Sequence, residues 1–116
     1  MNNLVLAYLG DAVYELYVRD YLIRQGLCKV KDLQKTAVQY VSAVSQAEIL
    51  DDLITKEFLT EEEVDIVKRG RNAHSHQSKS TDIITYKKST GFETLIGHLY
   101  KNDRERLEEV MTEVLK

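Results

Sequence analysis

Two carboxylates occupy positions where a packed helix would be expected to carry neutral side chains. Asp11 lies in the stretch LAYLGDAVYE, among Leu, Val and Tyr, and Glu93 lies in STGFETLIGHLY, directly after Phe92. An unpaired buried carboxylate costs on the order of several kcal/mol, a penalty that normally shifts its pKa or recruits a cation. We therefore expect a positive charge close to both acids.

Each of these acids has a glycine near it in the sequence. Gly10 adjoins Asp11, and Gly97 follows Glu93 by one helical turn. A glycine inside a helix is about 1 kcal/mol less favourable than alanine, so it usually marks a close approach of another backbone. If two helices cross at these glycines, both carboxylates reach one Mg²⁺ ion. Such an ion completes its octahedron with waters and substrate phosphates, which indicates phosphodiester cleavage.

Both acids also have a structural interpretation. A helical Asp or Glu often forms a solvated ion pair, and Arg19 or Arg24 would provide a partner for Asp11. Glu15, one turn from Asp11, is either an auxiliary metal ligand or the ion-pair partner of Arg19. The sequence nominates no histidine as a general base.

Helices must position these side chains, because the chain has no proline and repeats apolar residues at i, i+3 and i+4 spacings. The pattern predicts an all-α fold in one domain, residues 1–116, since this length supports a single core. The expected helices cover about 3–25, 30–40, 42–56, 61–71 and from Asp82 or Thr85 to about 100, followed by a last helix that begins at Asp103. The first is expected to end at Gly26. Ser42 or Ser45 is expected to cap the third, a capping box of Thr60 and Glu63 the fourth, and Asp103 the last.

Burial can be predicted from the same pattern. The first helix is apolar on nearly every side, so we expect it to be the central, buried helix. Val44 and Ile54 are expected to face inward, and Cys28 to be a small buried side chain. A single cysteine cannot form an internal disulfide, and the N-terminus lacks the basic flank of a signal peptide. Both features favour a cytoplasmic protein, with no membrane span because Gly10 and Asp11 interrupt the first apolar run.

Basic residues gather in one part of an otherwise acidic chain. The net charge is −3, yet the segment 68–88 holds six Lys or Arg against one acid, Asp82, which gives a local charge of +5. Such a segment indicates that a polyanion binds at one place. The polar stretch between the fourth and fifth predicted helices is typical of a loop.

The words YLGDAVYE and GFETLIGHLY, in this order and separation, resemble the ribonuclease III endonuclease domain, whose signature has Leu-Gly-Asp-Ala and, far downstream, Phe-Glu-Ala-Leu-Ile-Gly. The chain length, the lack of an appended double-stranded-RNA-binding domain and the word KRGRNA resemble the Mini-ribonuclease III branch, and the similarity covers essentially the whole chain. The resemblance implies an all-helical homodimer that cleaves double-stranded RNA with Mg²⁺ and leaves 5′-phosphate and 3′-hydroxyl ends. It also implies the 23S ribosomal RNA precursor as substrate, and a ribosomal protein or ribosome precursor as a further partner.

The same resemblance assigns catalysis and Mg²⁺ binding to Asp11 and Glu93, on which the signature aspartate and the late glutamate fall. Further acids of full-length ribonuclease III fall on Leu4, Ala7 and Thr90, so this chain has a reduced acid set, which fits the Mini branch.

Duplex RNA would be held around the loop over 72–85, because Lys and Arg release counterions from phosphates, and amides and hydroxyls suit phosphates and 2′-hydroxyls. The expected RNA-binding residues are Lys68, Arg69, Arg71, Asn72, Ser78, Lys79, Lys87 and Lys88. Alternatively, these cations complement a helix dipole and solvate a loop. His74 and His76 form an H-x-H pair without a third metal ligand.

Three hypotheses for function follow. The leading one is a Mg²⁺-dependent endoribonuclease specific for double-stranded RNA. The second is a non-catalytic double-stranded-RNA-binding or ribosome-associated module, since part of the acid set is missing. The third is a helical protein-interaction domain that uses the apolar first helix as a dimer face, but it leaves the paired acids and the basic segment unexplained. Retention of Asp11 and Glu93 beside their glycines favours the enzyme.

Overall fold

The structure is a computed structural model that describes residues 1–73 and 82–116. Those residues form six helices and no strand, so the predicted all-α class is confirmed. In chain order the helices are α1 (Asn3–Arg24), α2 (Val30–Val41), α3 (Ala43–Thr55), α4 (Glu61–Arg71), α5 (Ile83–Asn102) and α6 (Arg104–Val114).

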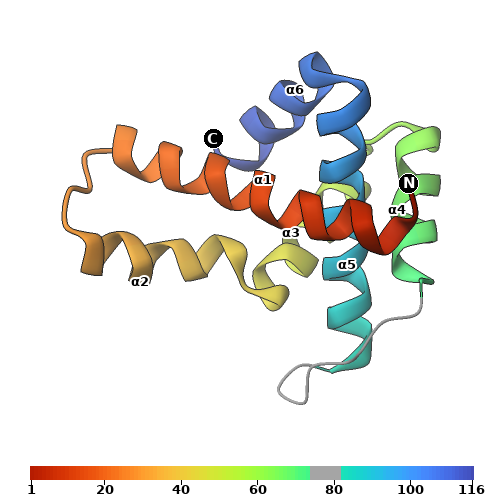
Figure 1. Ribbon diagram of the computed structural model, residues 1–116, viewed down its shortest axis with the longest axis horizontal. Helices are drawn as coiled ribbons and strands as arrows, with labels where there is room; N and C mark the ends of the chain where they lie inside the picture. Colours follow the sequence, from red (N-terminus) through yellow and green to blue (C-terminus); the bar gives the residue numbers. More distant parts are fainter. Residues whose placement is uncertain (74–81) are drawn as a thin grey trace.

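Helix α5 is at the centre of the fold. It contacts α1, α3, α4 and α6, and Figure 1 shows α1 crossing it near its middle. Its side chains Phe92, Leu95 and Ile96 are fully buried. In the core, the Phe92 ring meets the Tyr14 ring of α1 edge to face, with 5.0 Å between the ring centroids. Every helix that carries a candidate residue is therefore packed directly or indirectly against α5.

The prediction that the first helix is the central, buried one is wrong. Helix α1 buries one face and exposes apolar side chains on the other, among them Tyr8, which is 84% exposed, and Leu16, which is 66% exposed. Val44 and Ile54 are likewise exposed, and so is Cys28. An apolar side chain is favoured in buried positions, but the sequence does not indicate whether it is buried by the rest of its own chain or by another molecule.

Polar caps explain where the helices begin. Each predicted cap accepts a hydrogen bond from a backbone N–H in the first turn, and a cap of this kind stabilises a helix by about 1 kcal/mol. The caps are Ser42 for α3, Thr60 with Glu63 for α4, Asp82 for α5 and Asp103 for α6. Gly26, at φ +99°, follows the end of α1 as predicted.

The crossing of α1 and α5 is a contact between backbones. A Cβ atom added at Gly10 would lie 1.8 Å from the Glu93 carbonyl oxygen, and one added at Gly97 would lie 2.0 Å from the Leu6 carbonyl oxygen. Only a residue without a Cβ atom fits at either place. The predicted crossing at these two glycines is confirmed.

Helices α4 and α6 are joined by one arginine. The Arg106 guanidinium donates to both Glu63 carboxylate oxygens, at 2.8 and 2.9 Å, and to the Phe58 carbonyl oxygen at 2.8 Å. Glu63 is buried, and this bidentate pair compensates its charge. No helix within residues 1–73 and 82–116 is long and apolar enough to cross a membrane.

Candidate active site

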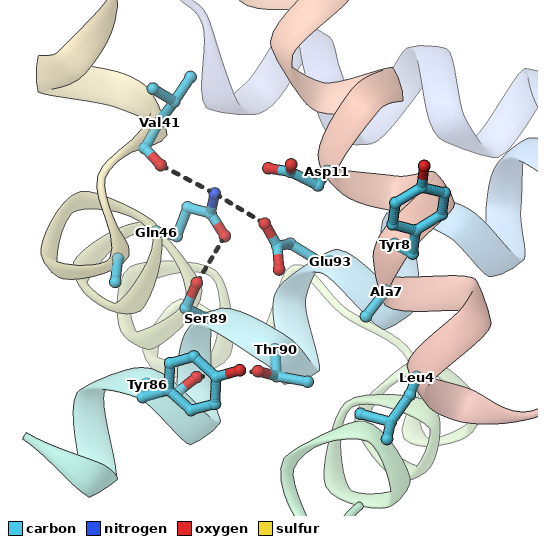
Figure 2. Close-up of a pocket in the computed structure, with 11 residues that line it drawn as sticks. Leu4, Ala7, Tyr8, Asp11, Val41, Gln46, Tyr86, Ser89, Thr90 and Glu93 are labelled. Atoms are coloured by element: carbon cyan, nitrogen blue, oxygen red, sulfur yellow. Dashed lines mark hydrogen bonds between the residues drawn. The ribbon is translucent and has the colours of Figure 1, made fainter. Parts of the chain in front are cut away.

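The crossing of α1 and α5 brings Asp11 and Glu93 together. Asp11 follows Gly10, and Gly10 is packed on the Glu93 backbone. Figure 2 shows the two carboxyl groups facing each other at one end of a shared pocket. The two acids that the sequence singled out are therefore neighbours in space, although 82 positions separate them in the chain.

This pocket lies among α1, α5 and the junction of α2 with α3. Its polar lining residues are Asp11, Gln46, Tyr86, Ser89, Thr90 and Glu93, and its remaining ones are Leu4, Ala7, Tyr8, Val41 and Ala43. Its volume is about 420 Å³. Since one water occupies roughly 30 Å³ in the liquid, the pocket has room for a hydrated cation and a phosphate group.

Leu4, Ala7 and Thr90, the positions on which the further acids of full-length ribonuclease III fall, all line the same pocket. The Thr90 hydroxyl donates to the Tyr86 carbonyl oxygen at 3.1 Å, within its own helix. In the described part of the chain, no place gathers three or more Asp, Glu, His or Cys side chains. The pocket therefore offers two carboxylates, Asp11 and Glu93.

Glu93 is mostly buried, and its charge is poorly compensated. Burial, and next the neighbouring Asp11 carboxyl group, raises the pKa of Glu93 to about 8, while a hydrogen bond from Gln46 acts in the opposite direction. Like charges this close favour a shared proton or a cation between them. We expected a positive charge close to both acids. Among the described residues that line the pocket, however, there is no arginine or lysine.

Asp11 differs from its expected setting, because its side chain is exposed rather than enclosed by apolar residues. The arginines proposed as its structural partners have other partners: Arg19 donates to Glu15 at 3.0 Å, and Arg24 pairs with Asp20 at 3.2 Å. Glu15 is therefore the ion-pair partner of Arg19, and it is not among the residues that line the pocket.

The donor set fits Mg²⁺. Both side chains at the pocket are hard oxygen donors, the pocket is open to solvent for the remaining waters, and the raised pKa of Glu93 marks a site that a cation would neutralise. Asp11 and Glu93 would hold the ion directly or through its waters.

The basic residues lie at the C-terminal end of α4 and in the N-terminal turns of α5, which precede and follow in sequence the segment drawn in grey in Figure 1. Lys68, Arg69 and Arg71 are in the last turn of α4, and Asn72 follows it. The close packing of Gly91 against Val67 and Arg71 places the C-terminal end of α4 against the middle of α5.

On α5, Lys87 is exposed, whereas Lys88 pairs with Asp51 of α3 at 3.0 Å. Lys88 is thus partly neutralised, which the sequence did not indicate. Ser78 and Lys79 lie outside the described residues, as do His74 and His76.

Sequence reasoning missed Gln46. It is 1% exposed and hydrogen-bonded to Glu93, yet it was not among the candidate residues. A signal existed, because Gln46 lies three residues after Ala43 and four before Leu50 on the face of α3 that turns inward. A polar residue on a buried stripe is a candidate for a partnered functional role.

Comparison with known proteins defines the class. The family described as the Ribonuclease III domain matches residues 4–104, which include both carboxylates and the whole pocket. The X-ray crystal structure of a protein from Fusobacterium nucleatum superposes with a TM-score of 0.85 at 32% identity, covering 97% of this chain and 92% of that one. The chain therefore belongs to the ribonuclease III domain family and has its all-helical fold.

Individual relatives narrow the assignment. A Mini-ribonuclease 3 from Enterococcus faecalis is 48% identical over 118 residues, covering 100% of this chain and 89% of its own length. Another, from Symbiobacterium thermophilum, is 51% identical over 110 residues, covering 93% of this chain and 83% of its own. The chain belongs to the Mini-ribonuclease 3 family, a branch of the ribonuclease III endoribonucleases.

Proposed function

We propose that this protein is a Mg²⁺-dependent endoribonuclease that hydrolyses both strands of double-stranded RNA. The observation that carries the proposal is the convergence of Asp11 and Glu93 at one open pocket, with the pKa of Glu93 raised by burial and by Asp11. A pair of acids held at this cost in stability is typical of a site that binds a cation and a phosphate.

In the proposed hydrolysis, the acids of the pocket hold the metal ion that activates the phosphate and a water. Mg²⁺, when bound, supplies Lewis-acid stabilisation of the phosphate and lowers the pKa of a water. Asp11, which is exposed, and Glu93, which is mostly buried, would hold the ion at the pocket. Water attacks phosphorus and loses a proton to solvent while the bond from phosphorus to the 3′-oxygen breaks. The departing 3′-oxygen takes up a proton from solvent, which leaves 5′-phosphate and 3′-hydroxyl ends.

Duplex RNA is held by the cations at the ends of α4 and α5. Lys68, Arg69, Arg71 and Lys87 contact phosphates, Asn72 contacts a phosphate or a 2′-hydroxyl, and Lys88 contributes less because of its pair with Asp51. Ser78 and Lys79, between these ends in the sequence, are proposed as further contacts on the charge of the segment alone.

The enzyme acts as a homodimer. An exposed apolar stripe runs along α1 through Val5, Tyr8, Ala12, Leu16 and Ile23. These positions recur on one side of a helix, and exposed stripes of this length usually mark an interface. Two copies joined there carry two pockets, one for each strand.

We propose the 23S ribosomal RNA precursor as the substrate, with a ribosomal protein or ribosome precursor as a further partner and the cytoplasm as the location. This part rests on membership of the Mini-ribonuclease 3 family. A specific observation keeps a second function in view: Leu4, Ala7 and Thr90 leave the pocket with two acids, and a non-catalytic double-stranded-RNA-binding module would need none.

Cleavage of a long perfect RNA duplex, with and without Mg²⁺, tests the proposal. We expect metal-dependent cutting by the wild type and a loss of roughly 100-fold or more in Asp11→Asn and Glu93→Gln, with RNA binding retained. Folding and dimerisation of all three proteins are checked first. A folded wild type that binds the duplex and never cuts it with Mg²⁺ or Mn²⁺ would favour the binding module.

A further inference from the structure

Gln46 is buried beside the pocket and joins three parts of the fold. Its Nε2 donates to the Val41 carbonyl oxygen at 3.1 Å and to Glu93 Oε2 at 3.3 Å, and its Oε1 accepts from Ser89 Oγ at 3.0 Å. Figure 2 shows all three hydrogen bonds radiating from this one amide. Gln46 therefore connects the end of α2 and the start of α3 to two successive turns of α5.

The orientation of this amide is determined by its partners. A backbone carbonyl such as that of Val41 can only accept, so the NH₂ end of the Gln46 amide must face it. The Ser89 hydroxyl can donate, and it does so to the opposite end of the amide. The second N–H of Nε2 is then directed at Glu93, whose carboxylate can only accept when ionised.

This arrangement restricts the Glu93 side chain. A glutamate has three rotatable bonds, and a free one samples several rotamers. Here one oxygen of Glu93 is fixed by a donor that is itself held at both ends, and the Glu93 backbone is fixed by its contact with Gly10. Both ends of the side chain are thus constrained while the carboxyl group faces Asp11 (Figure 2).

We propose that Gln46 is a positioning residue that holds the Glu93 carboxylate toward Asp11, so that both acids bind a single divalent cation, and that Ser89 acts through Gln46. The proposal rests on the proposed function for its consequence in catalysis. Gln46 itself provides neither the charge nor the reacting group. Residues that orient a metal ligand in this way typically account for 10- to 100-fold in metal affinity or activity.

The test compares Gln46→Met with the wild type, because methionine has a similar length and volume and forms no comparable hydrogen bond. Two quantities are measured: the dissociation constant of Mn²⁺ for the RNA-free protein, by calorimetry, and the Mg²⁺ concentration for half-maximal RNA cleavage. We expect both to rise roughly 10- to 100-fold in Gln46→Met, with RNA affinity in the absence of metal unchanged. A smaller rise is expected in Ser89→Ala.

Double-mutant cycles separate positioning from a general loss of stability. If Ser89 acts through Gln46, Ser89→Ala has no further effect on Mn²⁺ affinity in the Gln46→Met background. If Gln46 acts through Glu93, Gln46→Met has no further effect in the Glu93→Gln background. Asp103→Ala, which removes the cap of α6 away from the pocket, is the control for reduced stability, and it should leave Mn²⁺ affinity unchanged.

Wild-type Mn²⁺ affinity in Gln46→Met would overturn the proposal, and so would an equal loss in Asp103→Ala. If Gln46→Met does not fold, the same criteria apply to Ser89→Ala. The two proposals fail separately. Weaker Mn²⁺ binding in Gln46→Met, with no RNA cleavage by any protein, would refute the proposed function and leave the positioning role in place. If the wild type cleaves RNA and Gln46→Met binds Mn²⁺ as tightly as the wild type, the proposed function stands and the positioning role of Gln46 is refuted.

Discussion

At the scale of single residues, the raised pKa of Glu93 makes the stability of the protein depend on pH. In the metal-free protein its pKa is raised from 4.5 to about 8, first by burial and then by Asp11. The folded protein therefore holds this proton more tightly than the unfolded chain does. The resulting stability is complete below about pH 4.5 and is lost as the pH rises to 8. A cation between the acids would remove this loss.

We predict that Glu93→Gln flattens the pH dependence of unfolding. In a metal chelator, the melting temperature of the wild type should fall between pH 6 and pH 9 by more than that of Glu93→Gln, because the variant has no proton to lose at this site. Mg²⁺ should then raise the melting temperature of the wild type at pH 9 and have little effect on the variant. Glu15→Gln, which removes an exposed ion pair, is the control. Parallel curves for wild type and Glu93→Gln would contradict the burial-driven pKa shift.

The basic residues give a prediction for RNA binding. Lys87→Ala should weaken duplex binding about equally for every sequence and reduce the slope of log affinity against log salt by roughly 1, as expected for one lost phosphate contact. Lys101→Ala, at the other end of α5, should leave both unchanged. Equal effects of the two variants, measured by filter binding over a salt series, would place the RNA elsewhere.

At the scale of helices, the crossing of α1 and α5 depends on the absence of side chains. Gly10→Ala would direct a methyl group into the Glu93 carbonyl oxygen, which is backbone and cannot turn away. We expect a loss of about 3 kcal/mol or more in the free energy of unfolding, since overpacking against movable side chains already costs 1–3 kcal/mol. Gly26→Ala meets no atom within 4 Å and carries only the strain of its positive φ, so it should lose about 1–2 kcal/mol. Urea denaturation of both variants compares the two costs.

The pair of Glu63 and Arg106 between α4 and α6 should make stability fall toward acidic pH, whereas Glu93 makes it fall toward alkaline pH. Burial alone would raise the pKa of Glu63, but the hydrogen bonds from Arg106 and Thr60 outweigh it and hold the pKa below its ordinary value. The stability from this group is present above the unfolded pKa and is lost as the pH falls through the folded one.

Arg106→Met should therefore lower the free energy of unfolding by about 2–5 kcal/mol at pH 7, because it leaves Glu63 buried and unpaired. The difference from the wild type should shrink in acid, where Glu63 is protonated in both proteins. Arg24→Met breaks an exposed pair with Asp20 and should change stability by less than about 0.5 kcal/mol. A pH-independent deficit in Arg106→Met would show that packing of the arginine, and not its charge, stabilises the α4 and α6 contact.

The elements were more predictable than their burial. Caps such as Thr60 with Glu63, and the glycines at positions 10 and 97, act locally or through backbone contacts, so residue type alone identified them. The central helix could not be identified in this way, because α1 is as apolar as a core helix and the exposed face of Leu16 is indistinguishable in sequence from a buried one. Gln46 escaped notice because its partners Val41, Ser89 and Glu93 come from other helices.

At the scale of the whole molecule, the exposed stripe of α1 is the surface proposed for self-association. Leu16→Glu should convert the proposed homodimer to a monomer, because a charge would be placed at the middle of an apolar interface. Val38→Glu introduces the same charge at an exposed valine of α2 and should leave the dimer intact. Sedimentation equilibrium measures both. If the wild type is monomeric at micromolar concentration, the hypothesis that the stripe on α1 mediates self-association is wrong.

The two glycines at the α1 and α5 crossing have a consequence for protein engineering. Because Gly10 rests on the Glu93 backbone and Gly97 on the Leu6 backbone, the separation of the α1 and α5 main chains beside the two acids is determined by backbone contacts. Core substitutions that keep both glycines should therefore preserve the approach of the two helices, while the orientation of the Glu93 carboxyl group still depends on Gln46. A transplant of the proposed metal site into another helical scaffold therefore requires Gly10 with Asp11 on one helix, Glu93 with Gly97 on the other, and a donor in the place of Gln46.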